Sequence, residues 1–275
     1  MKKIMIILSL LPVIWLGSCN EKLSEVDYNP NVLSSKDYLR AEDAVFEIVN
    51  IFFKAVNDTA VVIHGYGVID HCTVTYNPEE NSLNFGYGST NRYCDDLKNR
   101  KGQYNADFSG QIFEEGVTAT IITDSLFVDD SLVVVNLEIK NLGLNNDNLP
   151  EYSLKVSSAL IRLADTTKVN DVSIITDFVM VWAEGSSTPI SPEDDMYSIT
   201  GTASGLSADL YEFSVIIQEP LLDYLDCSWI SQGTSQITVP TAEFPSGTID
   251  YIIEDGCFNE MYFYFNDNLF YDKIK

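Results

Sequence analysis

The side chains best suited to nucleophilic or metal chemistry in this 275-residue chain are four cysteines and two histidines: Cys72, Cys94, Cys227, Cys257, His64 and His71. No two of these cysteines have the two-to-four-residue spacing of a zinc knuckle. His71 and Cys72 could form a cysteine–histidine nucleophile, but a strand residue beside a structural cysteine is the simpler interpretation. We expect no metal and no cofactor, and we assign no catalytic residue.

An even number of cysteines in an exported protein is typical of disulfides. These four fall in two similar phrases, each with a cysteine, then a strand such as SLNF or GTID, then a turn and a second cysteine. We therefore predict the bridges Cys72–Cys94 and Cys227–Cys257, one in each phrase.

Acidic residues dominate the charge. The chain holds 41 acidic and 16 basic residues, which gives a formal net charge of −25. Such a charge repels nucleic acid and anionic lipid head groups, so we expect no nucleic-acid partner. Acidic clusters at Asp95-Asp96, Asp129-Asp130 and 193–195 could ligate calcium, although most acidic turns are merely solvated. A carboxylate pair could also serve glycan hydrolysis, but no pair stands out.

A fifth cysteine, Cys19, follows an apolar segment. Lys2 and Lys3 precede a nearly unbroken apolar run from Ile4 to Leu16, which is short for a membrane span and fits a secretory signal peptide. The run ends in LGSC, which resembles the lipobox of bacterial lipoproteins. We predict a signal peptide over 1–18 and an acylated Cys19 that anchors the chain to a membrane. An ordinary signal peptide with a chance cysteine is the alternative.

The elements that would position these residues begin with a helix. Residues 19–33 are polar and resemble a lipidated tether. Over 34–58 apolar residues recur at steps of three and four, and Ser34 with Asp37 resembles a capping box. We expect the apolar stripe to pack on its own domain. The opposite, polar face carries Asp37, Glu42, Asp43 and Glu47.

Nearly all of 59–275 has the pattern of strands. Short runs alternate apolar and polar residues between Gly, Asn, Asp and Pro, as in antiparallel sheets with one exposed face. The two cysteine phrases indicate an internal duplication, with related halves at about 59–150 and 151–275. We predict a mainly β fold of sandwich-like antiparallel sheets with one long N-terminal amphipathic helix.

Several stretches carry a resemblance: NFGYGSTNRYCDDLKNRKGQYNADFSG, YSITGTASG, and DCSWISQGTSQIT with GTIDYIIEDGCFNEMYFYFND. They resemble a group of exported lipoproteins of Bacteroidota over about 70–275, including the strand start Arg100-Lys101-Gly102. The second copy departs from the group, because YIIEDG stands where a YGxG turn is expected, which leaves its turn geometry open. The group has no assigned activity, so the resemblance implies an envelope location and no catalytic residues.

From the sequence we expect a non-catalytic cell-envelope lipoprotein, a structural or ligand-binding β module at the outer membrane that faces the periplasm or the cell surface. Exposed rings among the 15 Tyr and 14 Phe could stack on sugars, so glycans and proteins are the candidate ligands. The alternatives are a glycan-acting hydrolase with an unrecognised carboxylate pair, and a fimbrial subunit, which would need a strand to donate. The oligomeric state is left open.

Overall fold

The computed structural model describes residues 29–111, 113–164, 170–189, 191–251, 257 and 260–273. The predicted signal peptide, residues 1–18, and the predicted anchor Cys19 lie outside the described residues. In chain order the elements are α1 (Pro30–Asn57), α2 (Thr59–His64), β1 (Tyr66–Ile69), β2 (Cys72–Asn77), β3 (Ser82–Tyr93), β4 (Asn99–Phe108), β5 (Thr118–Val128), β6 (Ser131–Leu144), β7 (Pro150–Arg162), β8 (Val172–Glu184), η2 (Pro192–Asp194), β9 (Met196–Leu206), β10 (Glu212–Tyr224), β11 (Gln232–Thr238), β12 (Ser246–Tyr251), β13 (Glu260–Phe265) and β14 (Asn268–Lys273).

The strands form one antiparallel sheet in which each strand pairs with the next along the chain, from β1 to β14. The predicted mainly β class, the antiparallel pairing and the long N-terminal helix are confirmed. The sandwich and the duplication are not confirmed, because the described strands belong to a single continuous sheet. The alternation of apolar and polar residues along each strand explains why one face of the sheet is buried and the other is exposed. In β6, for example, Val133, Val135, Leu137 and Ile139 are all buried, while Glu138 and Lys140 are exposed.

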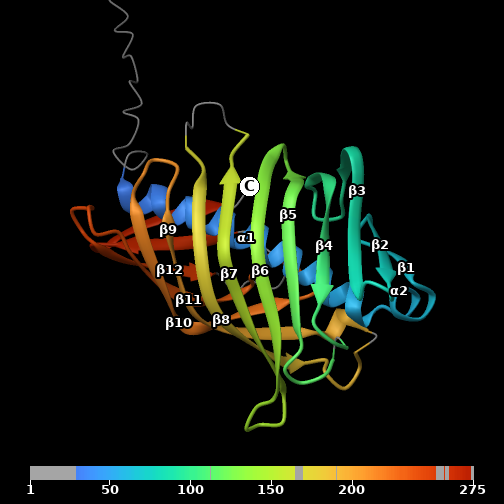
Figure 1. Cartoon of the computed structure of the whole chain (residues 1–275). Helices are drawn as coiled ribbons and strands as arrows, with labels where there is room; N and C mark the ends of the chain where they lie inside the picture. Colours follow the sequence, from blue (N-terminus) through green and yellow to red (C-terminus); the bar gives the residue numbers. More distant parts are fainter. Residues whose placement is uncertain are drawn as a thin grey trace, which may run out of the picture.

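Helix α1 lies inside the curl of this sheet. Figure 1 shows the blue helix crossing behind the green and yellow strands, with orange and red strands on its other side. It contacts β7 and β8 as well as β11, β12 and β13, so it joins the early and late parts of the sheet. Of its 28 residues, 21 are buried, which makes the helix the centre of the core and not a cover on one face.

The predicted apolar stripe of α1 is confirmed, but its polar face is corrected. Val45, Ile48 and Phe52 are at most 3% exposed, as expected for the packed face. Asp37 and Glu42, expected to face water, are each 2% exposed. They are buried because later parts of the chain close over this side of the helix too and supply hydrogen bonds, such as the 2.9 Å bond from the backbone amide of Ala208, in the turn after β9, to Asp37.

The helix begins earlier than the predicted residue 34. The Asn29 side chain accepts a 2.9 Å hydrogen bond from the Asn31 amide, and Pro30 occupies the first turn, where its missing amide hydrogen is not needed. Residues 30–33 are therefore helix and not tether. Ser34 and Asp37 lie inside the helix and do not form its cap.

A second helix, α2, replaces the beginning of the predicted all-β region. The Asp58 side chain caps it by accepting a 2.9 Å hydrogen bond from the Val61 amide. Gly65 ends it in the left-handed conformation, with φ of 74°, which a residue with a side chain rarely adopts. Strand β1 starts only after this glycine.

One of the two predicted disulfides is present. Cys227 and Cys257 are bonded, with a Cα–Cα distance of 5.2 Å. Cys72 and Cys94 are free and buried, so the bridge predicted between them is absent. Strand β3 does not end near residue 87 as the prediction assumed. It continues to Tyr93, and the Cys94 backbone amide then donates a 2.9 Å hydrogen bond to the Lys98 carbonyl in the turn that leads into β4.

Candidate functional site

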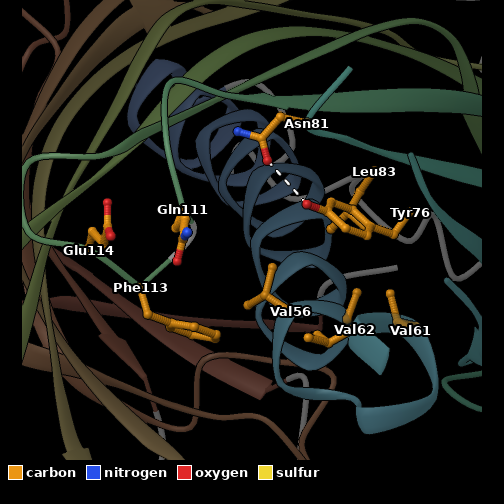
Figure 2. A pocket seen from close by; sticks show the side chains of 10 residues that line it. Val56, Val61, Val62, Tyr76, Asn81, Leu83, Gln111, Phe113 and Glu114 are labelled. Carbon is orange, nitrogen blue, oxygen red and sulfur yellow. Dashed lines mark hydrogen bonds between the residues drawn. The ribbon is translucent and has the colours of Figure 1, made fainter. Parts of the chain in front are cut away.

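A groove lies where α1 ends and α2 begins, under the loop that joins β4 to β5. We call it the α2 groove. Its first compartment has a volume of about 440 Å³ and is lined mainly by Val56, Val61, Val62 and Leu83. Figure 2 shows these apolar side chains pointing into one space, with Gln111, Phe113 and Glu114 facing them from the loop.

The second compartment of the α2 groove adjoins the first and has a volume of about 580 Å³. The two compartments share Val56, Val62 and Phe113 as lining residues. The second is the more aromatic, because Tyr152 and Trp182 line it from the strands β7 and β8. Volumes of this size and a mostly apolar lining are typical of small-molecule sites.

The loop over the groove, of which residues 109–111 and 113–117 are described, is held by the side-chain amides of two asparagines. The Asn81 amide donates to the carbonyls of Phe108 at 3.0 Å and Gly110 at 2.7 Å, which holds the start of the loop. The Asn141 amide donates to the Phe113 carbonyl at 3.1 Å, and the Gly116 amide donates to the Asn141 carbonyl at 2.8 Å. The loop is therefore positioned by the sheet at both of its ends.

Phe113 is exposed on this fixed loop. Its side chain is 54% exposed, and across the groove Val62 and Ile63 of α2 are 47% and 71% exposed. Single exposed apolar residues are ordinary, but here they border one concave surface. This grouping is what makes the α2 groove the leading candidate site.

The groove has few polar side chains, and the charged ones in its lining are acidic. Glu114 lines the first compartment and Glu115 the second, and the described residues that line the two compartments include no lysine, arginine or histidine. Tyr152 is 6% exposed, and burial, followed by the nearby Asp195, raises the pKa of its phenol to about 12. Its hydroxyl forms no hydrogen bond with another described residue.

Asn57 lies in the wall of the second compartment and is 8% exposed. Its side-chain nitrogen is enclosed and has no hydrogen-bond partner among the residues that the structure describes. A buried donor without an acceptor costs free energy, so this amide requires an explanation.

A second polar region lies along α1 and is enclosed. The carboxylate of Glu42 accepts hydrogen bonds from the hydroxyls of Tyr38 at 2.5 Å and Tyr251 at 2.6 Å. Burial raises the pKa of Glu42 to about 7. Asp223 accepts a 3.2 Å hydrogen bond from Asn50, and burial likewise raises its pKa to about 7. Glu42 and Asp223 are at most 2% exposed, so a substrate does not reach either carboxylate.

Within the resemblance motif Arg100-Lys101-Gly102, Arg100 joins β4 to the helix. Arg100 forms ion pairs with Glu47 of α1 and with Asp96, and Lys98 pairs with Asp43 of α1 at 2.6 Å. Gly102 has a φ of 101°, and a Cβ there would lie 1.8 Å from the Ser125 carbonyl oxygen. The motif therefore has a structural explanation: close packing of β4 on β5 and pairing with the acidic face of α1.

The other candidate residues of the sequence do not assemble into a site. His71 lies 3.0 Å from Asp95 at the surface, and burial raises the pKa of Cys72 to about 12, which disfavours a thiolate nucleophile. His64 ends α2. Among the described residues, one group resembles a metal site, Asp226 with Cys227 and Cys257, but its two sulfur atoms are bonded to each other.

The acidic clusters considered for calcium have other partners. Asp96 pairs with Arg100, and Asp130 accepts a 2.7 Å hydrogen bond from Lys101. Asp129 accepts one from the Asn99 amide at 2.8 Å. In the 193–195 cluster, Asp195 accepts a 3.0 Å bond from the Trp182 indole. Each of these acidic clusters therefore has at least one partner within the protein.

Comparison with known proteins gives no relative: no family model, no curated protein and no solved structure matches this chain. No helix in the described part of the chain is both long enough and apolar enough to cross a membrane. The sequence reasoning missed the α2 groove. The one local signal was the Asp58 cap before the apolar run AVVI, which could have predicted α2.

Proposed function

We propose that this protein is a non-catalytic cell-envelope lipoprotein, anchored through Cys19, whose folded module binds a small apolar molecule in the α2 groove. The observation that carries the binding role is the pair of adjoining apolar compartments around Phe113. A site of this volume buries most of the surface of a small ligand.

The envelope location is supported by the sequence and by one bond. The leader ending in LGSC favours export and acylation at Cys19. The Cys227–Cys257 disulfide suits an oxidising compartment. The outer membrane and the kinship with exported lipoproteins of Bacteroidota belong to the same proposal and rest on the sequence pattern.

The duplication also belongs to the proposal. Cys72 opens β2 and Cys94 follows β3, while Cys227 precedes β11 and Cys257 precedes β13. Each cysteine pair thus brackets successive antiparallel strands, which is the order that a duplicated unit would have.

The alternatives receive less support from the geometry. A hydrolase needs a reachable carboxylate pair, and the strongly perturbed Glu42 and Asp223 are enclosed. A fimbrial subunit would accept a donated strand in an open groove of its sheet, and α1 occupies the concave side of this one.

A glycan ligand is the second candidate because of three tyrosines on the outer face of the last hairpin. The Tyr262 ring lies 6.4 Å from that of Tyr264 and 5.6 Å from that of Tyr271, between ring centroids. Tyr264 and Tyr271 are 41% and 48% exposed. Such rings could stack on sugars.

Two measurements test the proposal. In cells, Cys19→Ser should abolish labelling by radioactive palmitate and leave the precursor uncleaved; continued labelling would refute the anchor.

In vitro, the soluble fragment from Asn20 should bind the uncharged hydrocarbon dye 1,6-diphenylhexatriene with a rise in fluorescence. Val62→Glu should weaken this binding at least tenfold, since it places a charge in both compartments. Ile175→Glu, at a 52% exposed position of β8, is the control and should bind normally.

A further inference from the structure

We infer that the ligand of the α2 groove is a cationic amphiphile, with an alkyl chain in the apolar compartments and an ammonium group beside Glu114 and Glu115. The inference rests on the proposed function and names the chemical class of the ligand. Three features of the groove support it: the exposed apolar rim, the two carboxylates of the loop, and the absence of basic side chains from the described residues of the lining.

The exposed apolar rim suits an alkyl chain. Ile63 and Leu144 border the second compartment and are 71% and 66% exposed, and large aliphatic side chains exposed together on a concave surface mark a binding site. Phe113 borders both compartments, and Figure 2 shows its ring pointing across the first compartment toward the valines of the two helices. A chain that follows this ring would occupy both compartments and remove these side chains from contact with water.

Glu114 and Glu115 place negative charge at this rim. Both side chains are exposed, and each compartment has one of them in its wall. Asp96 and Asp130 pair with basic side chains, whereas neither glutamate carboxylate forms a hydrogen bond or an ion pair with another described residue. The two charges are therefore available to a ligand.

Gly143 makes room for Glu115 at the second compartment. This glycine lines the compartment and has a φ of 88°. A Cβ there would lie 2.9 Å from Cδ of Glu115 and 3.0 Å from its Oε2, so the carboxylate lies against the backbone of β6 where a side chain would otherwise stand. The negative charge is thereby held at the edge of the compartment.

These charges select the sign of the head group. The described residues of both linings include no basic side chain, and the whole chain carries a net charge of −25. An anionic head group would be repelled by both carboxylates, whereas an ammonium group would be attracted to them. Because the carboxylates are exposed, the attraction is moderate and depends on the salt concentration.

The ligand class is tested by displacement of bound diphenylhexatriene from the fragment that begins at Asn20, which contains every described element. Dodecyltrimethylammonium and dodecyl sulfate, both used below their micellar concentrations, have the same alkyl chain and opposite charges. At low ionic strength the cation should displace half of the dye at about a tenfold lower concentration than the anion. Equal displacement, or a preference for dodecyl sulfate, would overturn the inference and leave the groove as a site for uncharged molecules. Failure of the dye to bind to the wild-type fragment would instead refute the proposed function.

The double variant Glu114→Gln, Glu115→Gln tests where the head group lies. It should bind the uncharged dye as the wild type does, while the preference for the cation should fall to about twofold or less. The matched control is Glu212→Gln, Glu243→Gln, which removes the same charge from two exposed positions outside both linings and should keep the full preference. Both control positions adjoin residues that contact the first half of α1, whereas the groove lies at its last turn.

An undiminished preference in the loop variant, or an equal loss in the two variants, would show that the loop does not select the ligand and would overturn the inference. Salt gives a second measurement on the wild type. Raising the ionic strength from about 0.01 M to about 1 M shortens the Debye length from about 30 Å to about 3 Å and should reduce the preference for the cation. A preference that stays the same would contradict selection by charge.

Discussion

The hydroxyl of Tyr251 donates a 2.6 Å hydrogen bond to the carboxylate of Glu42, which lies 209 residues earlier in the chain. The bond joins strand β12 to the middle of the central helix. Because both groups are buried, the protonation state of Glu42 affects the stability of the whole fold.

Stability should fall as the pH rises from about 4.5 to 7. Burial raises the pKa of Glu42 from 4.5 to about 7 and that of Asp223 from 3.8 to about 7. The folded state therefore holds protons that the unfolded state has released, so their contribution to stability is complete below the unfolded pKa values and is lost as the pH rises through the folded ones. Urea unfolding at pH 5 and pH 8 measures this, and greater stability at pH 8 would contradict it.

Glu42→Gln should reduce that pH dependence. The amide keeps the size of the side chain and can still accept a tyrosine hydrogen bond, but it carries no charge to bury. We expect the variant to be more stable than the wild type at pH 8, by up to about 3 kcal/mol for a shift of this size. Glu79→Gln, at an exposed turn, is the control and should follow the wild-type curve.

Phe52→Ala should destabilise the protein by about 3–5 kcal/mol, because it leaves a cavity in the core. The Phe52 ring is 3% exposed and lies 5.9 Å from the Phe108 ring, between centroids, so it ties α1 to β4. Phe113→Ala is the matched control. Its ring is 54% exposed, and the loss in chemical denaturation should remain below about 1 kcal/mol. Equal losses in the two variants would refute the central position of α1.

Removal of the Cys227–Cys257 bridge should cost about 3–4 kcal/mol in the chain-entropy model, since the bonded residues are 30 apart. The double variant Cys227→Ser, Cys257→Ser measures this loss by urea unfolding. Peptide mapping without reductant should recover this linked pair, with Cys72 and Cys94 alkylated once the protein is unfolded. A linked peptide of Cys72 with Cys94 would contradict their free state.

Local patterns predicted the parts of the fold that local rules control. The stripe through Val45, Ile48 and Phe52 repeats with the helical period, so the helix and its packed face could be read directly. Alternation in β6 likewise predicted a strand with one buried face. The beginning of α1 was missed because Asn29-Pro30 also suits a polar tether.

Long-range contacts explain what the sequence did not reveal. By sequence, Asp37 and Glu42 resemble surface residues of a helix. Hydrogen bonds from Ala208 and Tyr251, which are far away in the sequence, lower the free-energy cost of burying them. The α2 groove likewise depends on contacts between residues that are far apart in the sequence. Its walls come from α2, from the 109–117 loop and from β7 and β8, and no local pattern brings Phe113 and Trp182 to one surface.

Helix α1 also separates the N-terminal end of the fold from the end that carries the groove. At 1.5 Å per residue its 28 residues span about 42 Å. Cys19 precedes this helix in the sequence, whereas the α2 groove is lined by the last turn of the helix, including Val56 and Asn57. An acylated Cys19 would therefore attach the membrane to one pole of the protein and leave the groove at the opposite pole. A ligand would then have to be collected from the aqueous phase and not by lateral diffusion out of the bilayer, so an apolar ligand would need a carrier or a nearby source to reach it.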